Sequence, residues 1–141
     1  MGRRITGVVG ALALLPVLAA PARAQDEAIE EAKTSARAWL LLQDGYDFDE
    51  SWTRAGELLR TAVARKEWTA KWSVTRAPLG KVGSRGVKSA EYATTMPGAP
   101  DGEYVVLKYD TAFENNQTVE ERLILRKEPD GLWRVASYFI R

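Results

Sequence analysis

The apolar residues of this chain change their spacing halfway along it. Between residues 27 and 74 they recur every three or four positions, the spacing that puts side chains on one face of an α-helix. From residue 103 to the end they recur at alternate positions, as in a β-strand with one buried face. Helices that precede the strands, rather than alternate with them, predict an α+β fold with helices packed on a curved four-stranded antiparallel sheet.

The first half contains three predicted helices. The first covers Glu27–Asp44, with Asp26 expected as its N-cap. The second begins at a cap, either Asp49 or Ser51, and continues to Val63 with one apolar stripe that starts at Trp52. The third covers Lys66–Val74.

The second half contains four predicted strands, over residues 86–95, 103–113, 118–128 and 132–140. The last strand is apolar on both faces under strict alternation, with Trp133 and Phe139 on one face and Tyr138 on the other. We therefore expect it to lie in the middle of the sheet. The same ambiguity leaves open which sheet face the helices cover.

The N-terminus has the pattern of a cleaved signal peptide. Arg3 and Arg4 precede an apolar stretch over residues 8–18, and Ala22-Arg23-Ala24 supplies small residues for cleavage before Gln25. The apolar stretch is shorter than the roughly 20 residues of a membrane-spanning helix, and no cysteine follows it to carry a lipid. We therefore predict a signal peptide over residues 1–24 and a single mature domain over residues 25–141. The domain is expected in the periplasm or secreted, without a membrane anchor after cleavage.

The amino-acid composition excludes several kinds of catalytic and metal site. The chain has no cysteine and no histidine, which excludes disulfides, cysteine nucleophiles, serine–histidine triads and typical zinc sites. Cleavage would remove three of the 20 basic residues and none of the 19 acidic ones, so the mature domain has 17 against 19, a net charge of −2. That balance disfavours nucleic acid as a partner. We predict no cofactor and no metal.

Glu121 interrupts an otherwise apolar row formed by Val119, Leu123 and Leu125. If that row faces the helices, the carboxylate points into the core, where burial costs several kcal/mol unless a cation pairs with it. Arg76 and Arg85 are the candidate partners. The group is then either the polar base of a ligand pocket or a structural ion pair, unless a β-bulge turns Glu121 to solvent.

Tryptophans supply the other candidate pocket residues. Trp39 and Trp72 lie on predicted apolar helix faces, where their rings can line a ligand pocket or simply fill the core. Asp110 and Glu103 offer carboxylates beside Tyr104 and Tyr109 for acid–base chemistry, although Asp110 falls on the more polar face of its strand.

The mature chain resembles a family of exported bacterial proteins known only as domain-of-unknown-function family 4019. The residues that carry the resemblance are Trp39, Ser51-Trp52, Trp68, Arg76–Gly80, Arg85, Pro97–Tyr104, Phe113, Glu120-Glu121, Asp130–Val135 and Tyr138–Ile140. The resemblance implies an exported location and a cone-like fold similar to the nuclear-transport-factor-2-like and cystatin-like folds. It implies no activity and no catalytic residue.

These observations favour a non-catalytic domain of the cell envelope that binds a small ligand or an envelope protein on its concave sheet face. The candidate pocket consists of Glu121, Arg76, Arg85, Trp39 and Trp72. The alternative is a carboxylate- and tyrosine-dependent isomerase or dehydratase acting on a small hydrophobic molecule. A third interpretation has the sheet pairing with a second copy to form a homodimer.

Overall fold

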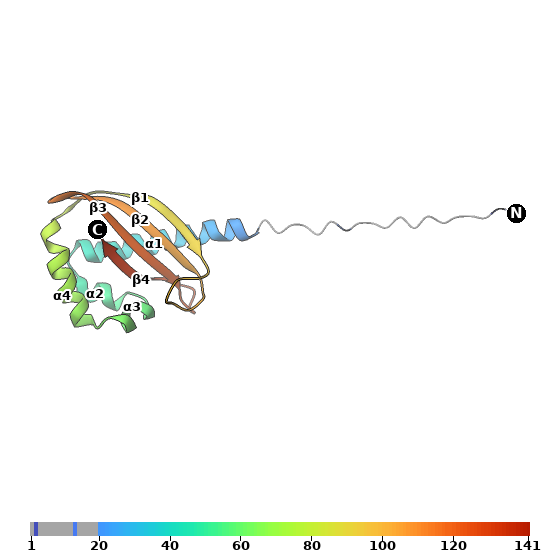
Figure 1. Cartoon of the computed structure of the whole chain (residues 1–141), viewed down its shortest axis with the longest axis horizontal. Coiled ribbons are helices and arrows are strands. Elements are labelled where there is room, and N and C mark those ends of the chain that lie inside the picture. Colours follow the sequence, from blue (N-terminus) through green and yellow to red (C-terminus); the bar gives the residue numbers. More distant parts are fainter. Residues whose placement is uncertain (1, 3–12, 14–19) are drawn as a thin grey trace.

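The computed structural model describes residues 2, 13 and 20–141. The basic and apolar segments of the predicted signal peptide therefore lie almost wholly outside the described residues. Helices come first along the chain and four strands follow (Figure 1), as the spacing of the apolar residues predicts. No helix in residues 20–141 is both long and apolar enough to cross a membrane.

Helix α1 (Ala20–Asp44) runs along one face of the sheet (Figure 1). Its buried side is rich in alanine, including Ala32 and Ala36, which lets the helix backbone lie close to the strands. The predicted end at Asp44 is confirmed, whereas the predicted cap is wrong because the helix begins before Asp26, which lies inside it.

Three shorter helices follow, α2 (Phe48–Thr53), α3 (Glu57–Ala62) and α4 (Arg65–Thr75), and then a single 3-10 turn, η1 (Ala77–Leu79). The predicted third helix is confirmed as α4. The continuous helix predicted over residues 49–63 is wrong, because the chain breaks at Gly56. The Gly56 amide donates to the Val135 carbonyl at 2.8 Å, which ties the link between α2 and α3 to the sheet.

The sheet contains β1 (Val82–Ala93), β2 (Tyr104–Phe113), β3 (Asn116–Lys127) and β4 (Trp133–Ile140). Each strand pairs antiparallel with the next in the order β1-β2-β3-β4, so the sheet stays open with β1 and β4 at its edges. The predicted α+β class is confirmed.

The predicted central position of the last strand is wrong, because β4 is an edge strand. The apolar pattern is misleading because of a register shift against β3, where Ser137 pairs with Ile124 and Val135 with Leu125, leaving Ala136 as an extra residue. The bulge moves Tyr138 onto the buried face, beside Trp133 and Val135. What strict alternation interprets as two apolar faces is therefore one face that changes parity at a bulge.

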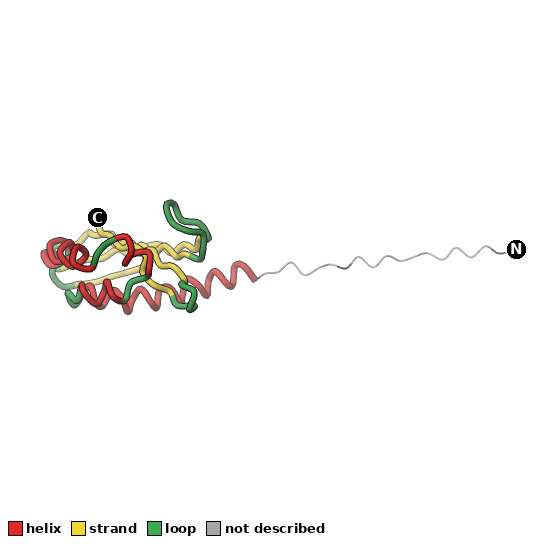
Figure 2. Tube along the Cα trace, turned by 90° about the horizontal axis from the view of Figure 1, so that it is seen from below, coloured by secondary structure: helices red, strands yellow, loops and turns green. Residues whose placement is uncertain are grey.

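The helices cover the sheet face that carries alternate residues of β2 and β3. Figure 2 shows α1 and the strands as two layers. The buried sheet residues in the core between them are Val105, Leu107, Tyr109, Leu123, Leu125, Trp133, Val135 and Tyr138. This resolves the ambiguity over the covered face and places Glu121 on the helix side of the sheet.

Candidate functional site

Glu121 points into the core, as its place in the apolar row predicts, and its side chain is fully buried. One carboxylate oxygen accepts hydrogen bonds from Arg85 Nε at 2.7 Å and from Thr111 Oγ1 at 2.6 Å. The other accepts a hydrogen bond from the Tyr138 hydroxyl at 2.5 Å. Both oxygens are thus engaged by protein donors.

Arg85 extends the network to the helices. Its two terminal nitrogens donate to the Asp44 carboxylate at 2.8 and 2.9 Å, a bidentate contact of the kind that suits a guanidinium. Arg76 Nη2 reaches the same carboxylate at 3.4 Å, and its Nη1 donates to the Gly80 carbonyl at 2.6 Å. We call Asp44, Arg76, Arg85 and Glu121 the ion cluster; it holds two cations and two anions.

The four residues of the ion cluster come from four different parts of the fold. Asp44 ends α1, Arg76 directly follows α4, Arg85 lies on β1 and Glu121 on β3. The Arg76 guanidinium also lies over the Phe113 ring, 4.4 Å from its centroid. The ion cluster therefore joins both layers of the fold.

The two predicted tryptophans reach the same place through Tyr138. The ring centroid of Tyr138 lies 5.1 Å from that of Trp39 and 4.6 Å from that of Trp72. All five residues of the predicted pocket thus come together, three through charge and two through aromatic packing. Trp39 is further fixed by its indole N–H, which donates to the Ser51 carbonyl at 2.8 Å.

Burial sets the protonation behaviour of the network. Burial, followed by the negative charge of Glu121, raises the pKa of Tyr138 well above its usual value. Burial alone would lower the pKa of Arg85, but its hydrogen bonds to Asp44 and Glu121 raise that pKa overall. Near neutral pH, Tyr138 is therefore a protonated hydrogen-bond donor and Arg85 a permanent cation.

Sequence reasoning missed Asp44, Thr111 and Tyr138. Asp44 carried a usable signal, because a carboxylate at a helix C-terminus opposes the helix dipole unless a cation compensates it. Thr111 stands in the buried row of β2, where a lone hydroxyl needs a partner. Tyr138 carried no such signal, since the β4 bulge reverses its face.

The second predicted group of carboxylates is not brought together. The Asp110 side chain is 71% exposed and lies 4.0 Å from Lys88. Glu103 accepts from the Tyr92 hydroxyl at 3.1 Å, while the Tyr104 hydroxyl donates to the Pro100 carbonyl. Asp110 and Glu103 therefore have separate partners and do not build an acid–base site with Tyr104 or Tyr109.

An open groove lies away from the ion cluster, between α1, the α2–α3 segment and the β3–β4 turn, with a volume of about 1000 Å³. We call it the hairpin groove. Its lining residues are Ser35, Ala38, Trp39, Leu42, Thr53, Arg54, Ala55, Arg60, Glu128, Pro129, Asp130, Leu132, Trp133, Arg134 and Val135. Of the five predicted pocket residues, Trp39 alone lines it.

The groove mixes apolar and charged side chains. Leu132 is 57% exposed at its edge. Arg134 is held by Glu128 and Asp130, and Arg54 by Glu50. Within the described part of the chain, Arg60 forms no ion pair. The groove thus offers an exposed apolar side chain and a cation free to pair.

Comparison with known proteins identifies one relationship. A family model described as a protein of unknown function, DUF4019, matches residues 35–138. The match contains the ion cluster and all residues that line the hairpin groove. No curated protein matches the chain.

Proposed function

The chain belongs to the DUF4019 family, and we propose that it is an exported, non-catalytic domain that holds a segment of a partner protein in the hairpin groove. One contrast carries this proposal. Both oxygens of the buried Glu121 carboxylate are engaged by Arg85, Thr111 and Tyr138, whereas the groove is open and keeps an exposed leucine and an unpaired arginine at its rim.

The ion cluster argues against catalysis. A general base must come within hydrogen-bond reach of the substrate proton that it removes. Both oxygens of Glu121 already accept protein hydrogen bonds, and none of the three pockets described on residues 20–141 is lined by Glu121, Arg76 or Arg85. The raised pKa of Tyr138 also keeps its proton in place near neutral pH. The cluster is then structural, in agreement with one of the two interpretations of Glu121.

The groove suits an extended polypeptide with an apolar anchor beside an acidic residue. Trp39 and Trp133 have already used their indole N–H groups, on the Ser51 carbonyl and on Glu31, so their rings serve as apolar floor. Leu42 and Leu132 add aliphatic surface, and Arg60 supplies a cation at the rim. The volume is at the upper end of the range for small-ligand pockets, and the groove is open to solvent rather than enclosed, which favours a segment over an enclosed small molecule.

Substitution of one groove leucine tests the proposal. Peptides selected from a displayed random library for binding to the chain are measured against Leu132→Ser and against Val74→Ser. Leu132 lines the groove at 57% exposure, whereas Val74 is 76% exposed on α4 and does not line it. Fully burying a leucine contributes about 1.5–3 kcal/mol. Since Leu132 is 57% exposed, a partner that covers it would gain about 0.9–1.7 kcal/mol, so Leu132→Ser should weaken binding roughly four- to eighteenfold.

The control variant decides the outcome. We expect Val74→Ser to leave the affinity within about twofold, because no groove contact changes. Equal losses in both variants, or no loss in Leu132→Ser, would refute the groove as the binding site.

We also propose that residues 1–24 are a signal peptide removed on export to the periplasm or medium. A second proposal concerns the fold: we infer that the domain is similar to the nuclear-transport-factor-2-like and cystatin-like folds. The basic and apolar N-terminal segments support export, and the open sheet with helices on one face supports the likeness. Mass spectrometry of the exported protein should find Gln25 as its first residue. A retained Met1 in that fraction would contradict the proposal.

The hydrogen bond between Glu121 and Tyr138 supports one alternative function, a carboxylate- and tyrosine-dependent isomerase or dehydratase. Arg85 and Asp44 are 16% and 21% exposed, so a cavity would have to open beside them. Such an enzyme requires a small hydrophobic molecule that shifts the NMR signals of Trp72 and Tyr138. Shifts confined to the groove residues during a ligand screen would exclude it.

A further inference from the structure

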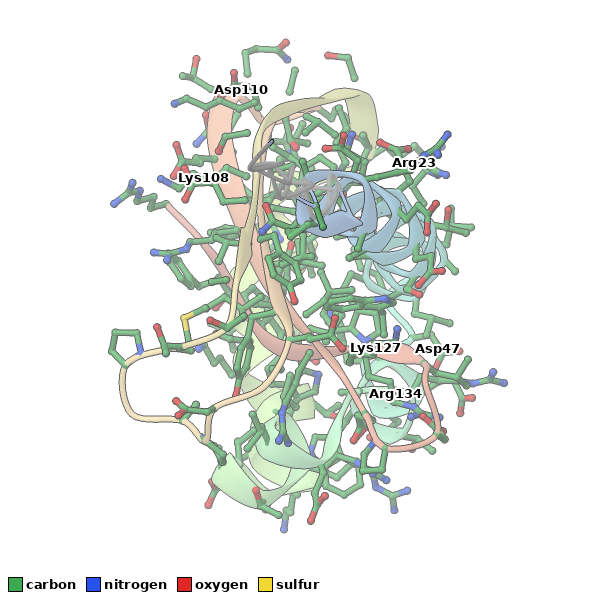
Figure 3. The ribbon with its side chains drawn as sticks, turned by 90° about the vertical axis from the view of Figure 1, so that its right-hand side faces the viewer. Arg23, Asp47, Lys108, Asp110, Lys127 and Arg134 are labelled. Atoms are coloured by element: carbon green, nitrogen blue, oxygen red, sulfur yellow. The ribbon has the colours of Figure 1, made fainter. Side chains whose placement is uncertain are left out.

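The sheet face opposite α1 carries cations on neighbouring strands. Lys108 on β2 and Arg122 on β3 are directly paired across the two strands, and Arg126 follows four residues along β3. Figure 3 shows Lys108 on the side of the sheet away from α1. We call Lys108, Arg122 and Arg126, with Val106, Ile124 and Phe139 among them, the basic face.

These cations lack the partners that other charges of the chain have. Within residues 20–141, none of the three forms an ion pair, although most arginines elsewhere in the fold do. Like charges directly opposite each other on adjacent strands destabilise a sheet. The pairing of Lys108 with Arg122 therefore costs folding stability, and no ion pair within residues 20–141 offsets that cost.

The two arginines are held in place rather than free to move into solvent. The Arg122 guanidinium lies 5.5 Å from the Phe139 ring centroid, and that of Arg126 lies 5.9 Å from the Tyr104 ring centroid. Each has a buried Nε without a hydrogen-bond partner. Since these Nε atoms are buried, a docked carboxylate can reach only the terminal nitrogens of the two stacked, half-buried guanidinium groups, which suit a carboxylate as donors.

Acidic residues bordering the basic face narrow the class of partner. Glu91 on β1 pairs across the strands with Val106, and Asp110 follows Lys108 by two residues on β2. Asp110 lies on the same uncovered side of the sheet in Figure 3. A continuous polyanion such as nucleic acid or an anionic membrane would meet these carboxylates, whereas a polypeptide can place its own carboxylates only where cations await them.

We propose that the basic face docks an extended acidic segment of a partner protein, with glutamate at positions i and i+4 and an apolar residue at i+2. Residues four apart on a strand are separated by about 13 Å, and alternate side chains share one face. An extended segment has the same spacing, so two glutamates match Arg122 and Arg126 while the residue between them covers Ile124. Lys108, opposite Arg122, adds a second cation for the first glutamate.

The test uses two synthetic peptides titrated into the isotope-labelled chain and followed by NMR. The first has glutamates at i and i+4 around a leucine, and the second has the same composition with the glutamates adjacent. We expect the first to bind at least tenfold more tightly and to shift the amide signals of β2 and β3, with affinity falling as salt rises. Equal affinities, or shifts outside the basic face, would overturn the proposal.

Charge reversal supplies the matched variants. Lys108→Glu should weaken binding of the first peptide at least tenfold, while raising the thermal midpoint because it replaces a like-charge pair with an opposite-charge pair. Lys66→Glu makes the same charge change at an exposed site on α4 and should leave the affinity within about twofold. Equal losses in the two variants would show a net-charge effect and overturn the proposal.

Two further probes address the other possible occupants. Vesicles rich in phosphatidylserine and a single-stranded DNA oligonucleotide should bind more weakly than the first peptide at equal salt. Tighter binding of either probe at β2 and β3 would overturn the choice of a protein segment. The proposal is independent of the hairpin groove, because Leu132→Ser should leave this peptide's affinity unchanged.

Discussion

Removing the charge of Glu121 should destabilise the fold far more than its side-chain volume suggests. Glu121→Gln keeps the shape of the side chain but leaves Asp44 to balance two arginines, of which Arg76 is fully buried and Arg85 is 16% exposed. Hydrogen bonds to a charged group contribute about 1.5–3 kcal/mol each, against about 0.5–1.5 kcal/mol for neutral ones. With three such bonds affected, we expect a loss of about 3 kcal/mol, in line with the cost of breaking a buried ion pair.

Urea unfolding followed by tryptophan fluorescence measures this loss, since Trp39 and Trp72 both pack on Tyr138. A loss of 3 kcal/mol corresponds to a fall of about 12 °C in the thermal midpoint of a domain this size. Glu120→Gln is the matched control on the same strand. Its partners Lys88 and Arg141 are 52% and 67% exposed, so its removal should shift the midpoint much less.

A double variant shows whether charge balance is the cause. Glu121→Gln together with Arg85→Gln leaves one anion and one cation, Asp44 and Arg76, and restores a neutral cluster. We expect the pair to be at least about 1 kcal/mol less destabilising than the sum of the single variants. Strict additivity, or a loss from Glu121→Gln no larger than that from Glu120→Gln, would refute the reasoning.

Three further outcomes follow from the structure. Gly80→Ala should lower the free energy of unfolding in urea more than Gly98→Ala. Both glycines have positive φ, but an added Cβ at Gly80 would lie 2.7 Å from Glu114 Oε2, whereas an added Cβ at Gly98 would have no neighbouring atom within 4 Å. The free energy of unfolding should fall as the pH rises above about 10, because the folded state holds Tyr138 protonated while the unfolded chain releases that proton. Tyr138→Phe should reduce this fall when unfolding is measured at a series of alkaline pH values. A chain beginning at Gln25 should unfold at the same temperature as the full chain, because the removed residues whose exposure the structure describes (2, 13 and 21–24) are exposed; a lower midpoint would contradict this.

The class of fold could be predicted from the sequence because the spacing of apolar residues changes once, from a helical period in the first half to alternation in the second. Prediction from the sequence failed where a single contact between distant residues overrides a local pattern. The apolar stripe over residues 49–63 continues through Gly56, yet the contact of that residue with Val135 divides the helix in two. No local property of residues 49–63 reveals the position of a carbonyl on β4.

The candidate site shows the same limit. A carboxylate in an apolar row identified Glu121, and the need for a counter-charge identified Arg85, because both arguments depend only on the cost of burying a charge. Tyr138 was missed because one extra residue at Ala136 reverses the direction of every side chain after it. A period-two pattern cannot reveal such a bulge on its own, since both parities of β4 are apolar.

The ion cluster also affects the rate at which the domain unfolds. Asp44 lies 41 residues from Arg85 along the chain, and Arg85 lies 36 residues from Glu121, so the cluster can assemble only after helices and sheet have met. Contacts that form after the folding transition state slow unfolding without speeding folding. On this reasoning, Glu121→Gln should raise the unfolding rate about a hundredfold and leave the folding rate almost unchanged. In a chain with no cysteine to cross-link it, loss of the ion cluster should therefore shorten the lifetime of the native state wherever cleavage by a protease is faster than refolding.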